Sequence, residues 1–281
     1  MKFGVNSLIW TGDFNRSHLP LLPRLKEGGF DGLEIVVFDV ADFPARETRQ
    51  HLEANEMECT FCTAVTGEMS AISEDAGARQ KARTYVEDCI KVAADLGTKT
   101  FAGVLYAPIG YLPGRRRTEQ EWNREVEFLQ SLGETLARND MILALEPINR
   151  YETFFLNTIA DSVRLCEEVN NPRIGVLMDT YHANIEERDV AAAVRAAGKH
   201  LKHMHACEND RGIPGTGHVP WKGIFEGLRE LKYEGWLIIE SFGYTIKEIA
   251  TAACIWRSLA STPEEIAFEG VKFLRKMAAQ A

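Results

Sequence analysis

The chain has 281 residues, of which 45% are hydrophobic and 26% are charged, so a large core is available and disorder is not expected. Its formal net charge of −9 argues against nucleic acid or an anionic membrane as the main partner, because both attract basic surfaces. The first apolar run is short and broken, and no run of about 18 apolar residues follows, which predicts a cytoplasmic protein without a signal peptide or membrane span.

Short runs of apolar and β-branched residues alternate with longer segments that have the apolar spacing of helices. Helical spacing is clearest at residues 19–25, 82–96, 126–136 and 224–231, and glycine follows several of these segments just before the next short run. The short runs predict eight strands, at residues 3–9, 32–38, 58–65, 100–105, 141–146, 174–178, 201–205 and 236–240.

Strand and helix alternate through the whole chain, which predicts an α/β fold with a parallel sheet that is buried on both faces. Eight such units in 281 residues match a (β/α)₈ TIM barrel. An open doubly wound sheet is the alternative, but the turn after the first strand lacks the GxGxxG pattern expected there. No change of composition marks a boundary, so residues 1–281 are predicted to form one domain.

Potential metal ligands close four consecutive strands, the fifth to the eighth: Glu146, Asp179, His205 and Glu240. The carboxyl ends of barrel strands meet on the face where barrel enzymes build their active sites. Each residue alone is more simply explained as a helix cap, a solvated loop residue or a core histidine. Together, three converging carboxylates would repel one another without a cation, so the set predicts a metal site.

The donor types indicate which ion is expected. Three oxygen donors and one nitrogen, with no thiolate, favour Mn²⁺, with Mg²⁺ and Co²⁺ as alternatives and zinc less favoured. His203 lies two positions before His205, so in an extended strand both imidazoles face the same side.

Several motifs resemble the ketose 3-epimerases, the D-tagatose, D-allulose (psicose) and L-ribulose 3-epimerases of the xylose isomerase-like barrel superfamily. The matching strings are EPINRYETFFLNT, LMDTYHANIEE, HMHACENDRGIPGTGHV, IIESF and IWRSL. The resemblance implies a free ketose as the small-molecule substrate and epimerisation at carbon 3 through an enediolate. It also implies a homo-oligomer, either a dimer or a tetramer.

The resemblance also implies roles for individual residues. Glu146 and Glu240 would be the catalytic acid and base as well as metal ligands, together with Asp179 and His205. The residues expected to bind the substrate near its carbonyl end are Glu152, His182 and Arg211. His203 is expected to orient the site, and Trp10 either to wall the pocket or to pack in the barrel core.

Other features leave the substrate open. Cys207 stands where many ketose 3-epimerases have glycine, and the stretches NSLIW and YAPIGYLPGRRR also differ from better-known members. Related enzymes that act on 3-oxo-glycosides, hydroxypyruvate or inososes are therefore alternatives. The run at residues 115–117 is expected to be a solvated charge cluster rather than a phosphate site.

Two further classes are disfavoured. A metal-dependent nuclease would need a basic face and more than the seven histidines present. A non-catalytic sugar-binding barrel would not need both Glu146 and Glu240, and both are present.

Overall fold

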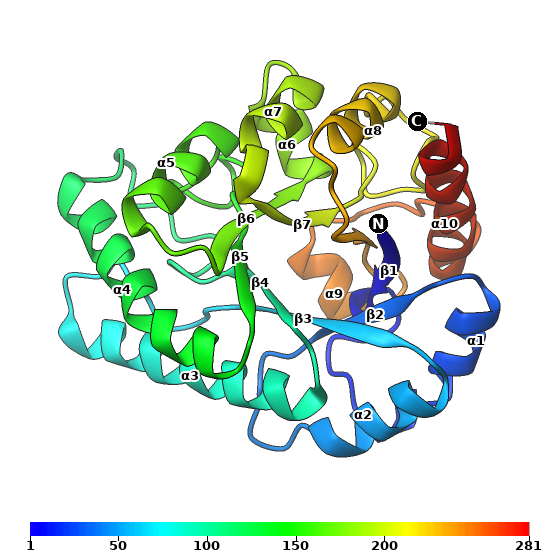
Figure 1. Ribbon diagram of the computed structural model, residues 1–281, viewed down its shortest axis with the longest axis horizontal. Coiled ribbons are helices and arrows are strands. Elements are labelled where there is room, and N and C mark those ends of the chain that lie inside the picture. The colour runs from blue at the N-terminus through cyan, green and yellow to red at the C-terminus, as the bar shows by residue number, and fades with distance from the viewer. Residues whose placement is uncertain (281) are drawn as a thin grey trace.

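Eight parallel strands close into a barrel, in the order β1 to β8, in the computed structural model, which describes residues 1–280. β1 pairs with both β2 and β8, and this pairing closes the ring. Figure 1 shows the strands as an inner ring with most of the helices arranged around it. The strands are β1 (Lys2–Asn6), β2 (Gly32–Val36), β3 (Glu58–Ala64), β4 (Thr100–Val104), β5 (Ile142–Leu145), β6 (Ile174–Asp179), β7 (Leu201–His205) and β8 (Trp236–Ile239).

The helices connect successive strands and pack against the outside of the barrel. α9 is the exception in Figure 1, where it is seen inside the outline of the strand ring. The α-helices are α1 (Leu21–Glu27), α2 (Ala45–Ala54), α3 (Ala76–Leu96), α4 (Glu119–Arg138), α5 (Ile159–Val169), α6 (Thr180–Glu186), α7 (Val190–Ala197), α8 (Trp221–Glu230), α9 (Lys247–Ala252) and α10 (Pro263–Gln280). Three short 3₁₀ helices complete the elements: η1 (Ser7–Ile9), η2 (Arg16–His18) and η3 (Gly198–His200).

The predicted strands are all present, although several are shorter than expected. The first ends at Asn6 instead of residue 9, because the Asn6 side chain accepts the N–H of Leu8 at 2.9 Å and starts η1. The fifth and eighth strands end one residue early, which leaves Glu146 and Glu240 just beyond the last paired residues.

The predicted helical segments correspond to α1, α3, α4 and α8. Glycine ends α3 as expected, since Gly97 has the left-handed φ of +88° that favours this residue. The same expectation is wrong for α8, which ends at Glu230, well before Gly235. Lys232 takes the left-handed conformation there, with φ +53°, and the N–H of Tyr233 bonds back to the carbonyl of Leu228.

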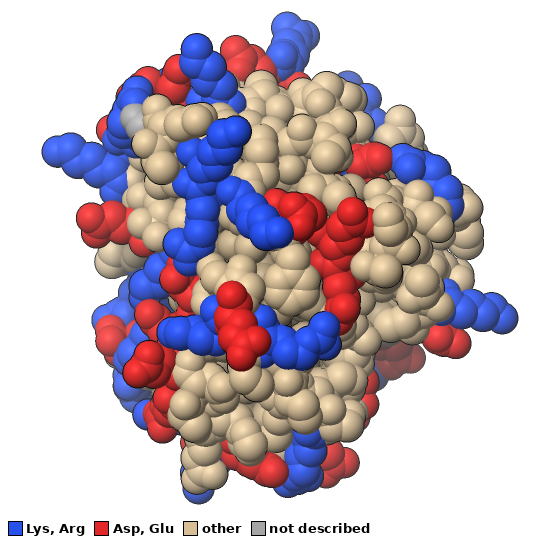
Figure 2. Space-filling view, turned by 90° about the vertical axis from the view of Figure 1, so that its right-hand side faces the viewer, with Lys and Arg blue, Asp and Glu red and all other residues tan. Residues whose placement is uncertain are grey.

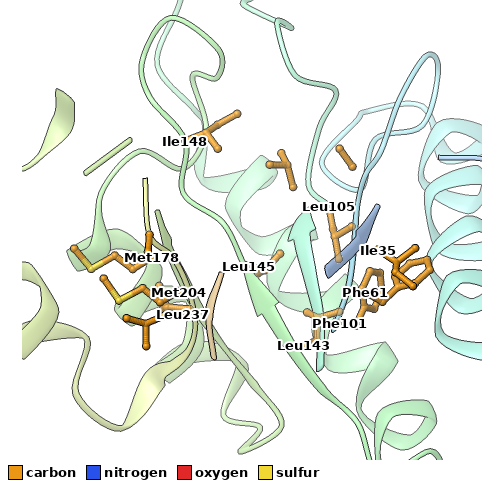
Figure 3. Close-up of a cluster of buried hydrophobic side chains, with 14 of the residues drawn as sticks. Ile35, Phe61, Phe101, Leu105, Leu143, Leu145, Ile148, Met178, Met204 and Leu237 are labelled. Carbon is orange, nitrogen blue, oxygen red and sulfur yellow. The ribbon is translucent and has the colours of Figure 1, made fainter. Parts of the chain in front are cut away.

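The two faces of the strands carry different side chains. Figure 3 shows large apolar side chains from neighbouring strands gathered together, including Ile35, Phe61 and Phe101. The rings of Phe61 and Phe101 meet edge to face, with centroids 5.5 Å apart. A separate cluster consists of Ala102, Ala144 and Leu177 alone.

These small residues share a strand face with the polar residues of the site. Positions two apart on a strand point to the same side, so Ala144 lies on the same face as Glu146, and Leu177 on the same face as Asp179. The alanines leave room on this face, where the wholly buried Glu34 and His203 also lie. The barrel therefore has an apolar outer layer beneath the helices and an inner face that delivers polar groups to one end.

In residues 1–280 no helix combines the length and apolar character that crossing a membrane requires. On the face shown in Figure 2, both basic and acidic side chains are exposed, and several basic ones lie next to one another.

Candidate active site

The four predicted metal ligands converge at the carboxyl end of the barrel. One potential ligand atom from each lies within 4.8 Å of those of the other three, and the four residues are all buried. The Nδ1 atom of His205 is the common neighbour, at 3.7 Å, 3.9 Å and 3.4 Å from carboxylate oxygens of Glu146, Asp179 and Glu240, respectively.

The donors of this cluster fit a divalent cation. Among the described residues, buried Nδ1 of His205 and buried Oε1 of Glu146 have no hydrogen-bond partner. Buried polar atoms are normally paired, so two unpaired buried atoms in one carboxylate cluster fit a site that binds a positive ion. The oxygen-rich set suits a hard or borderline cation.

The carboxylate of Glu34 on β2 fixes the orientation of His203 and His205, a role that the sequence did not predict. Its carboxylate accepts hydrogen bonds from Nε2 of His203 at 2.7 Å and Nε2 of His205 at 2.8 Å. Asn6 and Thr60 donate to the same carboxylate at 3.0 Å and 2.9 Å. Because Nε2 of His205 is bound in this way, its Nδ1 is the atom left to face the cluster.

The charge of Glu34 is stabilised by the two imidazoles. Burial alone would raise its pKa, but His205 and His203 outweigh burial and hold the pKa well below its usual range. The one available signal in the sequence is a carboxylate inside the apolar string GLEIV, and such a residue is costly to bury without partners.

Arg211 supplies the positive charge nearest to the cluster. Its Nη1 atom lies 2.5 Å from Oδ2 of Asp179 and 2.8 Å from Oε2 of Glu240. The same atom donates to Sγ of Cys207 at 2.8 Å, so the departure from glycine at this position gives the guanidinium an additional contact. The guanidinium also lies over the ring of Tyr181, 4.1 Å from its centroid.

The loop that carries Arg211 is held by a second buried carboxylate that the sequence did not reveal. Glu208 accepts the N–H groups of Gly215 at 2.7 Å and Val219 at 3.0 Å, and the indole N–H of Trp221 at 3.0 Å. Arg211 itself has a φ of +65°, which a non-glycine residue adopts only when its surroundings hold it there.

The other two predicted substrate residues lie beside the cluster and are joined through Asn149. The backbone N–H of Asn149 donates to Nδ1 of His182 at 3.1 Å, and its side-chain amide donates to Oε1 of Glu152 at 2.7 Å. Nη2 of Arg211 is 3.2 Å from Nε2 of His182. Burial lowers the pKa of His182 to about 3, so this imidazole is neutral at physiological pH.

The two candidate acid–base residues have opposite pKa shifts. Burial, with a contribution from the charge of Glu240, raises the pKa of Glu146 to about 7. Burial would also raise the pKa of Glu240, but His205 and Arg211 outweigh it and lower that pKa to about 2. Two carboxyl groups whose surroundings separate their proton affinities can act as an acid and a base.

The cluster opens into a cavity of about 590 Å³ that is also lined by Glu152, His182 and Arg211. Trp10 does not line this cavity, because η1 turns the chain and the indole N–H donates to Glu264 on α10 at 3.0 Å. We therefore assign Trp10 to packing rather than to the pocket wall.

The arginine run also lies outside the cavity. Arg115 pairs with Glu121 at 2.7 Å, and Arg117 pairs with Asp161 at 2.9 Å. The expectation of a solvated charge cluster does not hold for Arg117, whose side chain also donates to the carbonyl of Phe155 at 2.7 Å and lies over the ring of Trp122.

We predict that Glu34→Gln lowers the free energy of unfolding by about 2 kcal/mol, because the amide loses the charge that both imidazoles bind and presents an N–H group toward one of them. Loss of this support should also weaken metal binding by roughly 10- to 100-fold. Urea unfolding and metal titration measure the two effects.

Glu125→Gln is the matched control for this prediction. Glu125 is equally buried, but its carboxyl oxygens have no hydrogen-bond partner among the described residues, and burial raises its pKa to about 8. The group is therefore mostly neutral at pH 7, and the amide should be tolerated. Equal losses in the two variants would show that Glu34 has no special role.

Comparisons with known proteins agree with this architecture. The family model described as "Xylose isomerase-like TIM barrel" matches residues 22–277. A probable ketose 3-epimerase of Synechocystis sp. is 36% identical over 276 residues, which cover 98% of this chain and 96% of that protein.

Two crystal structures have nearly the same fold. D-allulose 3-epimerase from Methylomonas sp., in complex with D-allulose, has a TM-score of 0.93 at 28% identity and covers 99% of this chain and 97% of its own. A D-psicose 3-epimerase determined in the presence of D-fructose has a TM-score of 0.92 at 28% identity, with 99% of both chains covered. The chain therefore belongs to the xylose isomerase-like TIM barrel family and, within it, to the ketose 3-epimerases.

Proposed function

We propose that this protein epimerises free ketoses at carbon 3 by moving a proton between two carboxyl groups, with the help of a divalent metal. The observation that carries the proposal is the pair Glu146 and Glu240, which follow β5 and β8 and reach one buried cluster from different strands. The activities named for the relatives, on D-psicose (also called D-allulose) and L-ribulose, support the same reaction.

Epimerisation requires removal of the proton on carbon 3 and return of a proton to the opposite face. In this proposal the ionised carboxylate removes the proton, which leaves an enediolate, and the protonated carboxyl on the other side returns one. Glu146 and Glu240 are the two carboxyl groups in this proposal, and the configuration of the incoming sugar at carbon 3 determines which of them acts as the base. A sugar of the opposite configuration at carbon 3 would exchange the two roles.

The remaining residues bind and orient the sugar. Arg211 and the neutral His182 lie where they can donate hydrogen bonds to oxygens near the carbonyl, and Glu152 can accept one from a hydroxyl group. A divalent cation held by the four-residue cluster would supply Lewis-acid stabilisation of the negative charge that develops on the sugar oxygens. We propose Mn²⁺ as this ion, with Mg²⁺ and Co²⁺ as alternatives.

Three further expectations accompany this proposal. The chain is expected to act in the cytoplasm, to assemble as a homo-dimer or homo-tetramer, and to form a single domain over residues 1–281, of which residue 281 lies outside the described part. The alternative substrates are 3-oxo-glycosides, hydroxypyruvate and inososes, whose reactions can use the same acid–base pair.

The proposed function predicts which hydrogen becomes exchangeable. D-Fructose, D-tagatose and L-ribulose should be incubated with the Mn²⁺-loaded protein in deuterium oxide and followed by NMR. We expect deuterium at carbon 3 together with the 3-epimer, because the two glutamates would flank that carbon. Label at carbon 1 with an aldose product would indicate a 1,2-isomerase instead. Cleavage of a 3-oxo-glycoside without exchange in any ketose would favour the alternative substrate.

A second prediction separates proton transfer from binding. Glu146→Gln and Glu240→Gln should each lower kcat by at least about 10²-fold, which is typical of a lost general acid or base. Glu152→Gln should instead raise KM more than it lowers kcat, because Glu152 would only hold a hydroxyl group. Steady-state kinetics measure these effects, with the metal content of each variant checked. Near-normal kcat in a metal-loaded Glu146 or Glu240 variant would remove that residue from proton transfer.

A further inference from the structure

The cavity has two chemically different halves. Its deep half holds the buried polar residues of the site, whereas the outer half is mainly apolar. The outer walls include Phe38 and Ile109, whose side chains are 43% and 50% exposed and therefore mark the mouth. If the carbonyl end of a ketose binds in the deep half, its last carbons must lie in the outer half.

The positive charge in this cavity is confined to its deep half. Among the lining residues, all of which lie in the described part of the chain, the one lysine or arginine is Arg211. Its Nη1 atom already faces both Asp179 and Glu240, so its charge is balanced by the cluster. No basic side chain lines the outer half to receive an anionic group.

A single carboxylate, that of Glu248, lies at the mouth instead. Glu248 is in the first turn of α9, and its side chain is exposed and lines the cavity. The buried neighbours Ile249 and Ala250 anchor α9 against the protein. Within residues 1–280, Glu248 forms no hydrogen bond or ion pair, so its charge is not balanced by a basic partner.

We propose that Glu248 is a specificity-determining residue that selects unphosphorylated ketoses by repelling a phosphate on the last carbon of the substrate. This inference rests on the proposed function, because the binding direction of the ketose follows from it. The apolar walls around Glu248 would contact the carbon chain of the sugar without forming hydrogen bonds to its individual hydroxyl groups. We therefore expect the length of the sugar to affect binding less than its charge. A phosphate dianion at the mouth would meet an unpaired carboxylate, and no lysine or arginine lines the outer half of the cavity to offset it.

The test compares D-fructose with D-fructose 6-phosphate in the full-length Mn²⁺-loaded protein. The readout is the ratio of kcat/KM for the phosphate to kcat/KM for the free sugar. If turnover of D-fructose 6-phosphate is too slow to measure, its inhibition constant in the D-fructose reaction is measured in place of its kcat/KM. Glu248→Lys should raise the ratio roughly tenfold, and Glu248→Gln by a smaller factor, because unit charges a few ångströms apart in water change an affinity about fivefold.

Glu127→Lys is the control, since it makes the same charge change at an exposed position on α4 that does not line the cavity. Its ratio should stay within about twofold of that of the wild type, and the Glu248→Lys effect should shrink at high salt. An unchanged ratio in Glu248→Lys, or an equal change in Glu127→Lys, would overturn the inference. Failure of the wild-type protein to epimerise any ketose would instead contradict the proposed function itself.

Discussion

One buried carboxylate, Glu34, organises the inner face of the barrel. It bonds to His203 and His205 on β7, and its bond to Nε2 of His205 leaves Nδ1 to face the cluster of Glu146, Asp179 and Glu240. A buried anion with four hydrogen-bond donors is stable, whereas the same anion without them would cost several kcal/mol. A residue on β2 therefore determines which ring nitrogen of His205, a candidate metal ligand, faces the opening of the barrel.

The cluster beyond His205 carries an excess of negative charge. Three carboxylates meet there, and Arg211 pairs with two of them, Asp179 and Glu240. Glu146 keeps an unpaired oxygen, which explains why burial raises its pKa. A divalent cation bound among these residues would balance this charge.

The sequence predicted the barrel and the four cluster residues because each of those residues closes an apolar run, a pattern visible within a few positions. It did not reveal Glu34 or Glu208, whose partners lie far away in the chain or within an irregular loop. Glu34 and His203 are 169 positions apart in the chain, so no spacing between neighbouring residues indicates that they are bonded. Trp10 was ambiguous for a related reason, since a 3₁₀ turn after β1 redirects its side chain toward α10.

We propose that Glu146, Asp179, His205 and Glu240 form one divalent-metal site. The most direct test is an anomalous-difference map from a crystal of the protein loaded with Mn²⁺. The account predicts one dominant peak per chain, bounded by Nδ1 of His205 and oxygens of the three carboxylates, with Nη1 of Arg211 farther from Asp179 than the 2.5 Å found here. A crystal of active, Mn²⁺-loaded protein with no peak among these four residues, or with its dominant peak elsewhere, would contradict the account.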